Sequence, residues 1–184
     1  MTDAAPTPSA SLDHARERFI ALWGQMGSSW GIPRTMAQVH ALLFISGEPM
    51  CTDDVMATLE ISRGSASMTL RSLEEWGIVT RVHRRGDRKE YFTAEQDVWR
   101  LFRTIAAERK KREIDPLLDA LAECRQDVPD DRRVDTDAQV VRQHNERLDD
   151  LMAFITIVDS ISQRFLAPSG EGLEGAARLL DRAS

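Results

Sequence analysis

The sequence has few of the features that mark disulfide scaffolds, metal centres and membrane proteins. Its 184 residues include only two cysteines, Cys51 and Cys124, and neither these nor the four histidines have metal-ligand spacing. The apolar runs are much shorter than the roughly 18 residues that a membrane-spanning helix needs. The first residues contain neither a basic start nor an apolar signal core. We therefore expect a soluble protein of the reducing cytoplasm that does not bind a membrane.

Catalytic patterns are missing as well. Ser62, Ser65 and Ser67 do not form a nucleophile motif, and no glycine-rich phosphate loop follows an expected strand. Cys51 lacks basic neighbours and is followed by two aspartates, which argues against a reactive thiolate. We expect a protein that is not an enzyme and that binds neither a metal nor a cofactor.

Positive charge is scarce overall but concentrated in one segment. The net charge is −6, with a balance of −4 over residues 1–61, +5 over 62–113 and −7 over 114–184. A local basic segment indicates a surface for a polyanion, although a solvated helix face would look the same. The pattern inside this segment has to decide between the two interpretations.

The first third of the chain reads as two helices. Residues 1–10 are rich in Pro, Thr, Ala and Ser and are expected to be disordered. A helix is expected from Ser11 to the glycine at Gly31, and another from Pro33 to about Ser46. The second is apolar nearly all round, so it should be the buried centre of the domain. The apolar face expected on the first consists of Leu12, Ala15, Phe19, Trp23, Met26 and Trp30.

The basic segment has the pattern of a winged helix-turn-helix. A short helix capped by Thr52 is followed by a turn and a second helix over 62–76, capped by Ser62. Residues 78–84 and 89–93 read as two strands joined by a tight polar turn. The fold class expected is mainly α, with a two-stranded β wing and flanking N- and C-terminal dimerisation helices.

The rest of the chain is expected to be helical. A helix that begins at Ala94 should stop or kink at Asp115, before Pro116. A charged loop over 126–137 precedes a long helix over 138–166 with two apolar stripes, and a short terminal helix is expected around 173–180. The expected organisation is a disordered segment 1–10, a DNA-binding domain 11–93, and a linker and C-terminal helical region 94–184 for dimerisation and an effector.

The second helix of the helix-turn-helix has one core face and one open face. Ala66, Leu70 and Leu73 recur at core spacing. Small polar residues at the helix start let the backbone approach DNA, and Arg63 and Arg71 can reach phosphates or guanine edges. The outward residues are Gly64, Ser65, Met68, Arg71 and Ser72, of which Met68 could touch a thymine methyl group.

The expected wing is strongly cationic. Arg84, Arg85, Arg88 and Lys89 fall within six residues, which suits a narrow and negative minor groove. Asp87 is an unusual DNA contact, and we expect it to hold a neighbouring arginine in place.

These residues are similar to a known family. The matching stretches are Gly31-Ile32-Pro33-Arg34, Leu59-Glu60-Ile61-Ser62-Arg63-Gly64-Ser65-Ala66-Ser67-Met68 and Leu73-Glu74-Glu75-Trp76-Gly77-Ile78-Val79, followed by Gly86-Asp87-Arg88-Lys89 and Tyr91. Together they resemble the GbsR-like branch of the MarR superfamily, over roughly residues 17–125. The resemblance implies a homodimeric bacterial transcription regulator, usually a repressor, whose outer helices form the dimer.

The resemblance also assigns residues to the DNA interface. By this carry-over the recognition helix contributes Arg63, Ser65, Ser67 and Arg71, and the wing contributes Arg85, Asp87 and Arg88. The implied partner is double-stranded operator DNA, with helix 62–76 in the major groove and wing 84–89 in the minor groove. The alternative is a winged-helix module that binds proteins and not DNA.

The tryptophans and one histidine allow a second kind of site. Trp23, Trp30 and Trp99 could form an aromatic cage for a cationic effector, as some members of this branch sense choline or glycine betaine. The competing interpretation is that these tryptophans pack in the core. His40, in the apolar second helix, is expected to be a core histidine with its hydrogen bonds satisfied.

Overall fold

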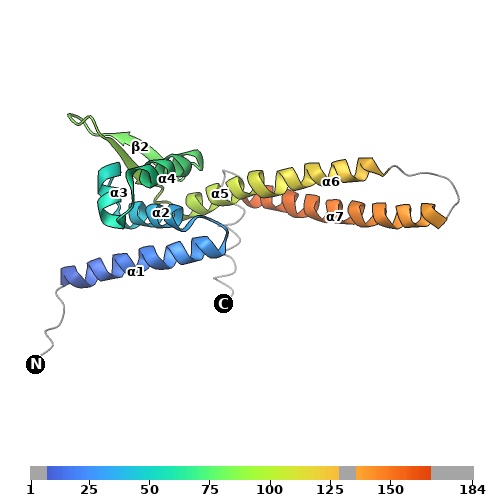
Figure 1. The fold of residues 1–184 in the computed structure, drawn as a ribbon, viewed down its shortest axis with the longest axis horizontal. Coiled ribbons are helices and arrows are strands. Elements are labelled where there is room, and N and C mark those ends of the chain that lie inside the picture. The colour runs from blue at the N-terminus through green and yellow to red at the C-terminus, as the bar shows by residue number, and fades with distance from the viewer. Residues whose placement is uncertain (1–7, 129–135, 167–184) are drawn as a thin grey trace, which may run out of the picture. The chain divides into compact units, whose positions relative to one another are not determined.

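The computed structural model describes residues 8–128 and 136–166, which form two compact units that meet between Leu101 and Phe102. Each unit is described by itself (Figure 1). The first contains α1 (Pro8–Ser29), α2 (Arg34–Ser46), β1 (Met50–Cys51), α3 (Thr52–Leu59), α4 (Arg63–Glu75), β2 (Val79–His83) and β3 (Glu90–Ala94). The described part is mainly α, as expected.

Helix α2 is the centre of the winged-helix unit. Seven of its residues are buried: Met36, Ala37, Val39, His40, Ala41, Leu42 and Leu43. This confirms the expectation from its apolar composition. Pro33 precedes the helix and is not its first residue, and Gly47 ends it with a left-handed φ of 68°.

Helix α1 packs on α2 through the middle of the expected stripe, where Phe19 lies beside Phe44 and Trp23 beside His40, and through two small residues. Gly24 and Gly27 are buried, and a Cβ on Gly27 would lie 2.5 Å from the Cβ of Ala37. Leu12 and Trp30, by contrast, are each more than half exposed. The glycines allow closer approach of the two helices than larger side chains do, while the two ends of the predicted stripe stay outside the contact. The helix also begins at Pro8, inside the segment expected to be disordered.

The helix-turn-helix forms at the predicted place, with one change at its first cap. The residue before α3 is Cys51, whose backbone N–H donates to Asp54 Oδ2 at 2.8 Å, so Thr52 is the first helical residue and not the cap. The Ser62 hydroxyl accepts the backbone N–H of Ser65 at 3.2 Å, as predicted for the start of α4.

The core face predicted for α4 is confirmed, because Ala66, Leu70 and Leu73 are all buried. Between α3 and α4, Glu60 adopts a left-handed φ of 53°. The tight turn between the two helices thus forms without a glycine.

The wing hairpin belongs to a three-stranded sheet. Strands β2 and β3 pair antiparallel with Arg81 opposite Phe92, and β1 pairs with the other edge of β3, with Met50 opposite Phe92. The sheet order is therefore β1-β3-β2. The two-stranded wing was predicted, whereas β1 was not, because two residues are too few to show a period-two pattern.

The second unit is helical. It begins within α5 (Val98–Arg109), at Phe102, and continues through a π-helical segment η1 (Lys110–Ile114), α6 (Asp115–Asp127) and α7 (Thr136–Leu166). Helix α6 packs against α7. The long helix predicted over 138–166 is confirmed. The helix expected around 173–180, most of the loop expected over 126–137 and residues 1–7 lie outside the described residues.

The regular helix is interrupted just before Pro116, close to the predicted place. Helix α5 ends at Arg109, and α6 begins at Asp115 with Pro116 in its first turn. Between them the backbone N–H of Asp115 donates to the carbonyl of Lys110, five residues earlier, in a π turn. Asp115 does not cap α6 with its side chain, because its carboxylate pairs with Lys110 Nζ at 2.6 Å. Among the described residues, no helix combines the length and apolar character that crossing a bilayer requires.

Candidate nucleic-acid interface

The outer face of α4 is open. Arg63, Gly64, Met68 and Arg71 are exposed, and the Met68 side chain is 67% accessible. A Cβ added to Gly64 would meet no atom within 4 Å. Ser65, Ser67 and Ser72 are half-buried along the flanks of this face. The first turn of the helix therefore presents small side chains and free backbone to a large partner.

The wing turn is held by Asp87. Its carboxylate accepts the backbone N–H of Lys89 at 2.9 Å and the hydroxyl of Tyr91 at 2.7 Å, and these hydrogen bonds lower the pKa of Asp87. Gly86 takes a φ of 86°, which a side chain would oppose. Asp87 pairs with no arginine side chain among the described residues; it holds the backbone of Arg88 and Lys89 and the hydroxyl of the buried Tyr91.

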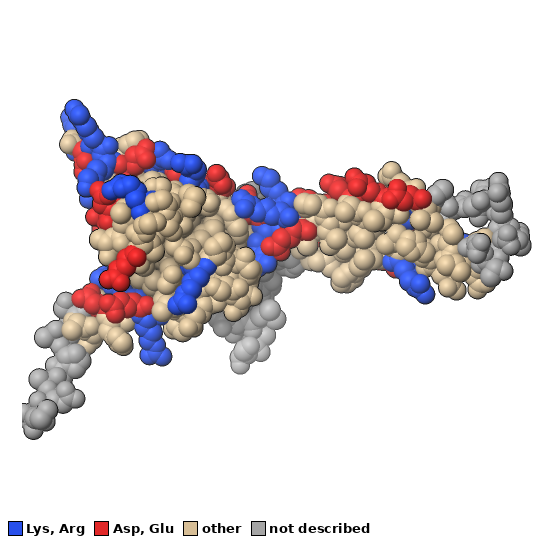
Figure 2. All heavy atoms as spheres, in the orientation of Figure 1, with Lys and Arg blue, Asp and Glu red and all other residues tan. Residues whose placement is uncertain are grey.

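The wing arginines differ in how far the protein restrains them. Arg84 lies over the Tyr91 ring at 4.3 Å and donates to the Pro49 carbonyl at 3.1 Å. The side chains of Arg85 and Arg88 have no ion pair or hydrogen bond with any residue that the structure describes. Figure 2 shows basic side chains gathered at the hairpin end of this unit, with acidic side chains among them. The tip of the wing is thus an uncompensated positive site.

Asp53, which the sequence analysis did not select, joins the recognition helix to the wing. One oxygen of its carboxylate pairs with the Arg63 guanidinium, and the other lies 3.2 Å from Lys89 Nζ. The Arg63 hydrogen bond, together with Lys89, lowers the pKa of Asp53. The signal in the sequence was an acidic residue in the first turn of α3, which reads as a favourable helix start and not as a contact.

Arg81 is a second cation that the protein compensates internally. Its guanidinium makes two hydrogen bonds to the Glu74 carboxylate, at 3.2 and 2.9 Å, and a further one to Glu90. It also lies over the Phe92 ring at 5.6 Å. Part of the positive charge of this segment is therefore neutralised by ion pairs that join the sheet to α4.

The three candidate effector tryptophans make no ring contact with one another among the described residues. Trp23 packs against Phe19 and His40, with ring centroids 5.6 and 6.2 Å apart. Trp30 and Trp99 are exposed, and in the described residues neither has a ring contact with Trp23. The expectation of core packing holds for Trp23 and is wrong for the other two, since Trp30 follows the last residue of α1 and Trp99 lies in the first turn of α5.

His40 is buried, but its hydrogen bonds are not all satisfied. Its side chain is 3% exposed, and Nε2 has no hydrogen-bond partner in the part of the chain described. Burial lowers the pKa of His40 to about 4. His40 is thus a core histidine, as expected, but the expectation that its hydrogen bonds are satisfied is wrong. The aromatic rings of Trp23 and Phe44 pack around its ring.

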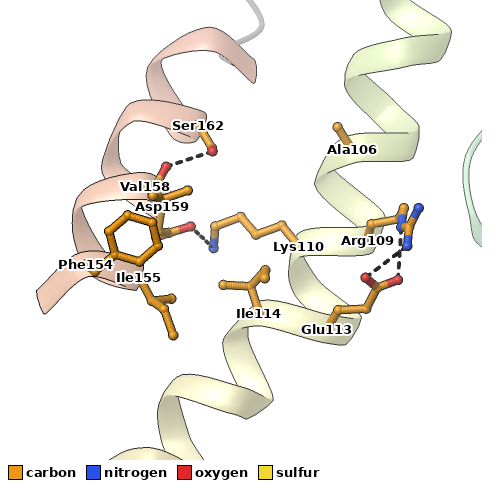
Figure 3. Close-up of a pocket in the computed structure, with 10 residues that line it drawn as sticks. All are labelled: Ala106, Arg109, Lys110, Glu113, Ile114, Phe154, Ile155, Val158, Asp159 and Ser162. Atoms are coloured by element: carbon orange, nitrogen blue, oxygen red, sulfur yellow. Dashed lines mark hydrogen bonds and ion pairs between the residues drawn. The ribbon is translucent and has the colours of Figure 1, made fainter. Parts of the chain in front are cut away.

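The helical unit contains a cavity of about 430 Å³ between α7 and the segment formed by α5 and η1 (Figure 3). Lys110 reaches across it to Asp159 at 3.1 Å, while Arg109 pairs with Glu113 at 2.9 Å. Phe154 and Val158 contribute apolar walls, and both are largely exposed. The charged groups around the cavity are already paired with one another, so it offers mainly apolar surface.

Comparisons with known proteins agree with this architecture. A model of the MarR family matches residues 30–90, the stretch from the end of α1 to the start of β3. The HTH-type transcriptional repressor GbsR of Bacillus subtilis (strain 168) is 25% identical over 119 residues, 65% of this chain and 66% of that protein. The HTH-type transcriptional repressor OpcR of the same organism is 24% identical over 96 residues, 52% of each protein. These matches thus span between half and two thirds of the relatives' own length.

A solved structure extends the likeness of fold beyond the matched domain. The crystal structure of a transcriptional regulator superposes with a TM-score of 0.64 at 19% identity, over 85% of this chain and 99% of that one. At this identity the likeness concerns the fold alone. The motifs of the helix-turn-helix and wing, the family model and the two relatives all point the same way: residues 30–90 match the MarR family, and the chain is similar to the transcriptional repressors GbsR and OpcR.

Proposed function

We propose that the protein is a homodimeric, sequence-specific DNA-binding transcriptional regulator of the cytoplasm, acting as a repressor. The observation that carries this proposal is the uncompensated charge of Arg85 and Arg88 at the wing tip, next to the open face of α4. A module that binds only proteins has no need of free arginines at a hairpin tip. The printed names of GbsR and OpcR, both transcriptional repressors, support the same class of function.

In this proposal α4 reads the major groove. Its first turn carries Gly64, Ser65 and Ser67, whose small side chains let the backbone come close to phosphates. Arg71 is exposed one turn further along and is long enough for a guanine edge. Met68 projects from the same face, where a thymine methyl group is its natural contact.

The wing enters the minor groove. Arg85 and Arg88 provide charge for a narrow groove, whose negative potential attracts arginine. Arg84 and Asp87 are fixed to Tyr91, so they support the turn while the two free arginines reach outward. Lys89 stands closer to the protein, beside Asp53.

Dimerisation is supported by apolar surface that one copy leaves uncovered. In the described part of α7, six large apolar side chains are at least 44% exposed: Val140, Leu151, Phe154, Ile157, Val158 and Ile161. Apolar patches of this kind mark protein interfaces. A second copy would cover them and place two α4 helices on half-sites about one DNA turn apart. Light scattering of the wild type should give a dimer mass and of Phe154→Glu a monomer mass, whereas a monomeric wild type would refute this part.

The test of DNA binding is a salt titration on selected DNA. Duplexes are enriched from a random pool with the wild-type protein, and the affinity for the enriched site is measured from low to high salt. If each protomer neutralises about three to five phosphates, log affinity against log salt should have a slope of roughly −5 to −9. A slope near zero would refute DNA binding through the wing and favour the protein-interaction module.

The proposal includes a small-molecule effector but assigns it no residues. Trp23, Trp30 and Trp99 do not share ring contacts in the described residues, so they do not support a cage. An equilibrium dialysis series with candidate ligands, including cationic ones, tests whether an effector exists.

A further inference from the structure

We propose that Asp53 is a specificity-determining residue of the DNA-binding face, which holds Arg63 and Lys89 away from the phosphates of unselected DNA. This inference rests on the proposed function. In it, the carboxylate competes with DNA for two cations, one on the recognition helix and one on the wing.

The geometry places Asp53 between the two DNA-reading elements. Arg63 is the first residue of α4, Lys89 immediately precedes β3, and Asp53 lies in the first turn of α3. Each carboxylate oxygen serves a different cation: Oδ1 faces Arg63 Nη2, and Oδ2 lies 3.2 Å from Lys89 Nζ. One acidic side chain thus compensates both.

All three side chains are within reach of DNA. Their exposed fractions are 45% for Asp53, 66% for Arg63 and 55% for Lys89. An exposed ion pair changes a folding equilibrium by only about fivefold or less, so stabilising the fold is a poor explanation for this pair of contacts. An interaction of that strength is, however, weak enough for a phosphate to displace.

The competition acts differently on the two kinds of DNA. Binding to unselected DNA depends almost entirely on cations that replace counterions at phosphates. Two cations held by Asp53 contribute little there, and the carboxylate itself repels the backbone. A matching site adds base contacts worth about tenfold to a hundredfold each, enough to draw Arg63 away from the carboxylate. Asp53 therefore weakens unselected binding more than it weakens binding to the operator.

A second cation pattern on the same face supports this interpretation. Arg81 is held by carboxylates from both α4 and β3, so it is committed to the fold, while Arg85 and Arg88 are free. Arg63 and Lys89 are intermediate, because they share a single carboxylate between two positive charges. The shared carboxylate leaves them with one uncompensated charge that a phosphate can take.

The test compares Asp53→Asn with two matched variants. Asp53→Glu keeps the charge at the same position. Glu60→Gln removes one negative charge from the turn between α3 and α4, where the Glu60 side chain is exposed and has no ion pair with a described residue. Each variant is titrated with the duplex enriched from the random pool and with a scrambled duplex of the same composition. Urea unfolding verifies that each is folded.

We expect Asp53→Asn to bind the scrambled duplex about three- to tenfold more tightly, with a salt slope steeper by about one to two per protomer. Its affinity for the enriched duplex should rise less, so the ratio of the two affinities falls. Asp53→Glu should keep most of the wild-type ratio between the affinities for the enriched and scrambled duplexes. Glu60→Gln should change both affinities by the same small factor.

Two results would overturn the inference. If Asp53→Asn leaves the affinity ratio and the salt slope of the wild type, or weakens both duplexes equally, Asp53 does not determine specificity. If Glu60→Gln lowers the ratio as much as Asp53→Asn does, overall charge and not the shared carboxylate is responsible. A wild-type protein that binds neither duplex would show instead that the proposed function itself is wrong, and the inference would fall with it.

Discussion

Acidification should loosen the packing of α1 on α2 through a single histidine. His40 is buried between Trp23 and Phe44, with both ring centroids 6.2 Å from its own. Its Nε2 finds no acceptor among the described residues, so a proton added there would leave an unpaired charge in the interior. The perturbation is a change of pH, and the matched variant is His40→Leu, which cannot be protonated.

The pKa of His40 sets the size of the effect. Burial lowers that pKa from 6.5 to about 4 in the folded chain, so the unfolded chain takes up the proton first as the pH falls. The contribution of neutral His40 to stability is fully present above pH 6.5 and is lost as the pH falls towards 4. The linkage between proton binding and folding lowers the free energy of unfolding by about 1.4 kcal/mol at about pH 5.5 and by about 3 kcal/mol near pH 4.

The assay is urea unfolding followed by circular dichroism at about pH 7.5 and about pH 5.5. The other titrating groups contribute equally to both proteins, so they cancel in the difference between the unfolding free energies of wild type and His40→Leu. That difference should shift by about 1.4 kcal/mol in favour of the variant at the lower pH. A control variant, His14→Leu, removes an exposed histidine from α1 and should follow the wild type. If the difference between wild type and His40→Leu is the same at both pH values, the buried neutral histidine is not responsible.

Three further predictions concern packing, the helical unit and the DNA face. Gly27→Ala should destabilise the protein by about 1–3 kcal/mol in urea, because the new methyl group meets α2, whereas Gly64→Ala, which meets open space, should cost nothing or gain up to about 1 kcal/mol. Lys110→Met should lower stability by about 1–3 kcal/mol, since it leaves two carboxylates facing each other without their cation, and an unchanged urea midpoint would contradict this. In gel shifts, Arg88→Ala should weaken binding to operator and scrambled DNA alike, while Arg71→Ala should cost about 1–3 kcal/mol on the operator and less on scrambled DNA. Equal losses for Arg71→Ala on both duplexes would remove it from base reading.

The elements with strong local signals could be predicted from the sequence. The core face of α4 follows from the spacing of Ala66, Leu70 and Leu73, and its start follows from the capping serine at Ser62. The hairpin follows from two β-rich runs around a glycine turn. These features depend on residues close together in the chain.

Features that depend on distant residues could not be predicted in the same way. The shared carboxylate of Asp53 requires knowing that the start of α3, the start of α4 and the end of the wing meet in space. The interruption before Pro116 was predictable from the proline, but its form, a π turn over Lys110–Ile114, has no local sequence signal. The contribution of Gly24 and Gly27 to the face of α1 was missed because glycines carry no hydrophobic signal, although here they approach α2 closely.

The wing is supported at one end only, and this has a consequence for how its binding can change. Strand β3 has neighbours on both sides where Tyr91 and Phe92 lie opposite β1, and both of these side chains are buried. Beyond that point residues 84–89 project from the sheet, and every one of their side chains is exposed. Arg84 and Asp87 contact Tyr91 and so support the turn, whereas the side chains of Arg85 and Arg88 touch no partner among the described residues. The affinity for DNA can therefore be retuned at these two positions with little effect on the stability of the fold.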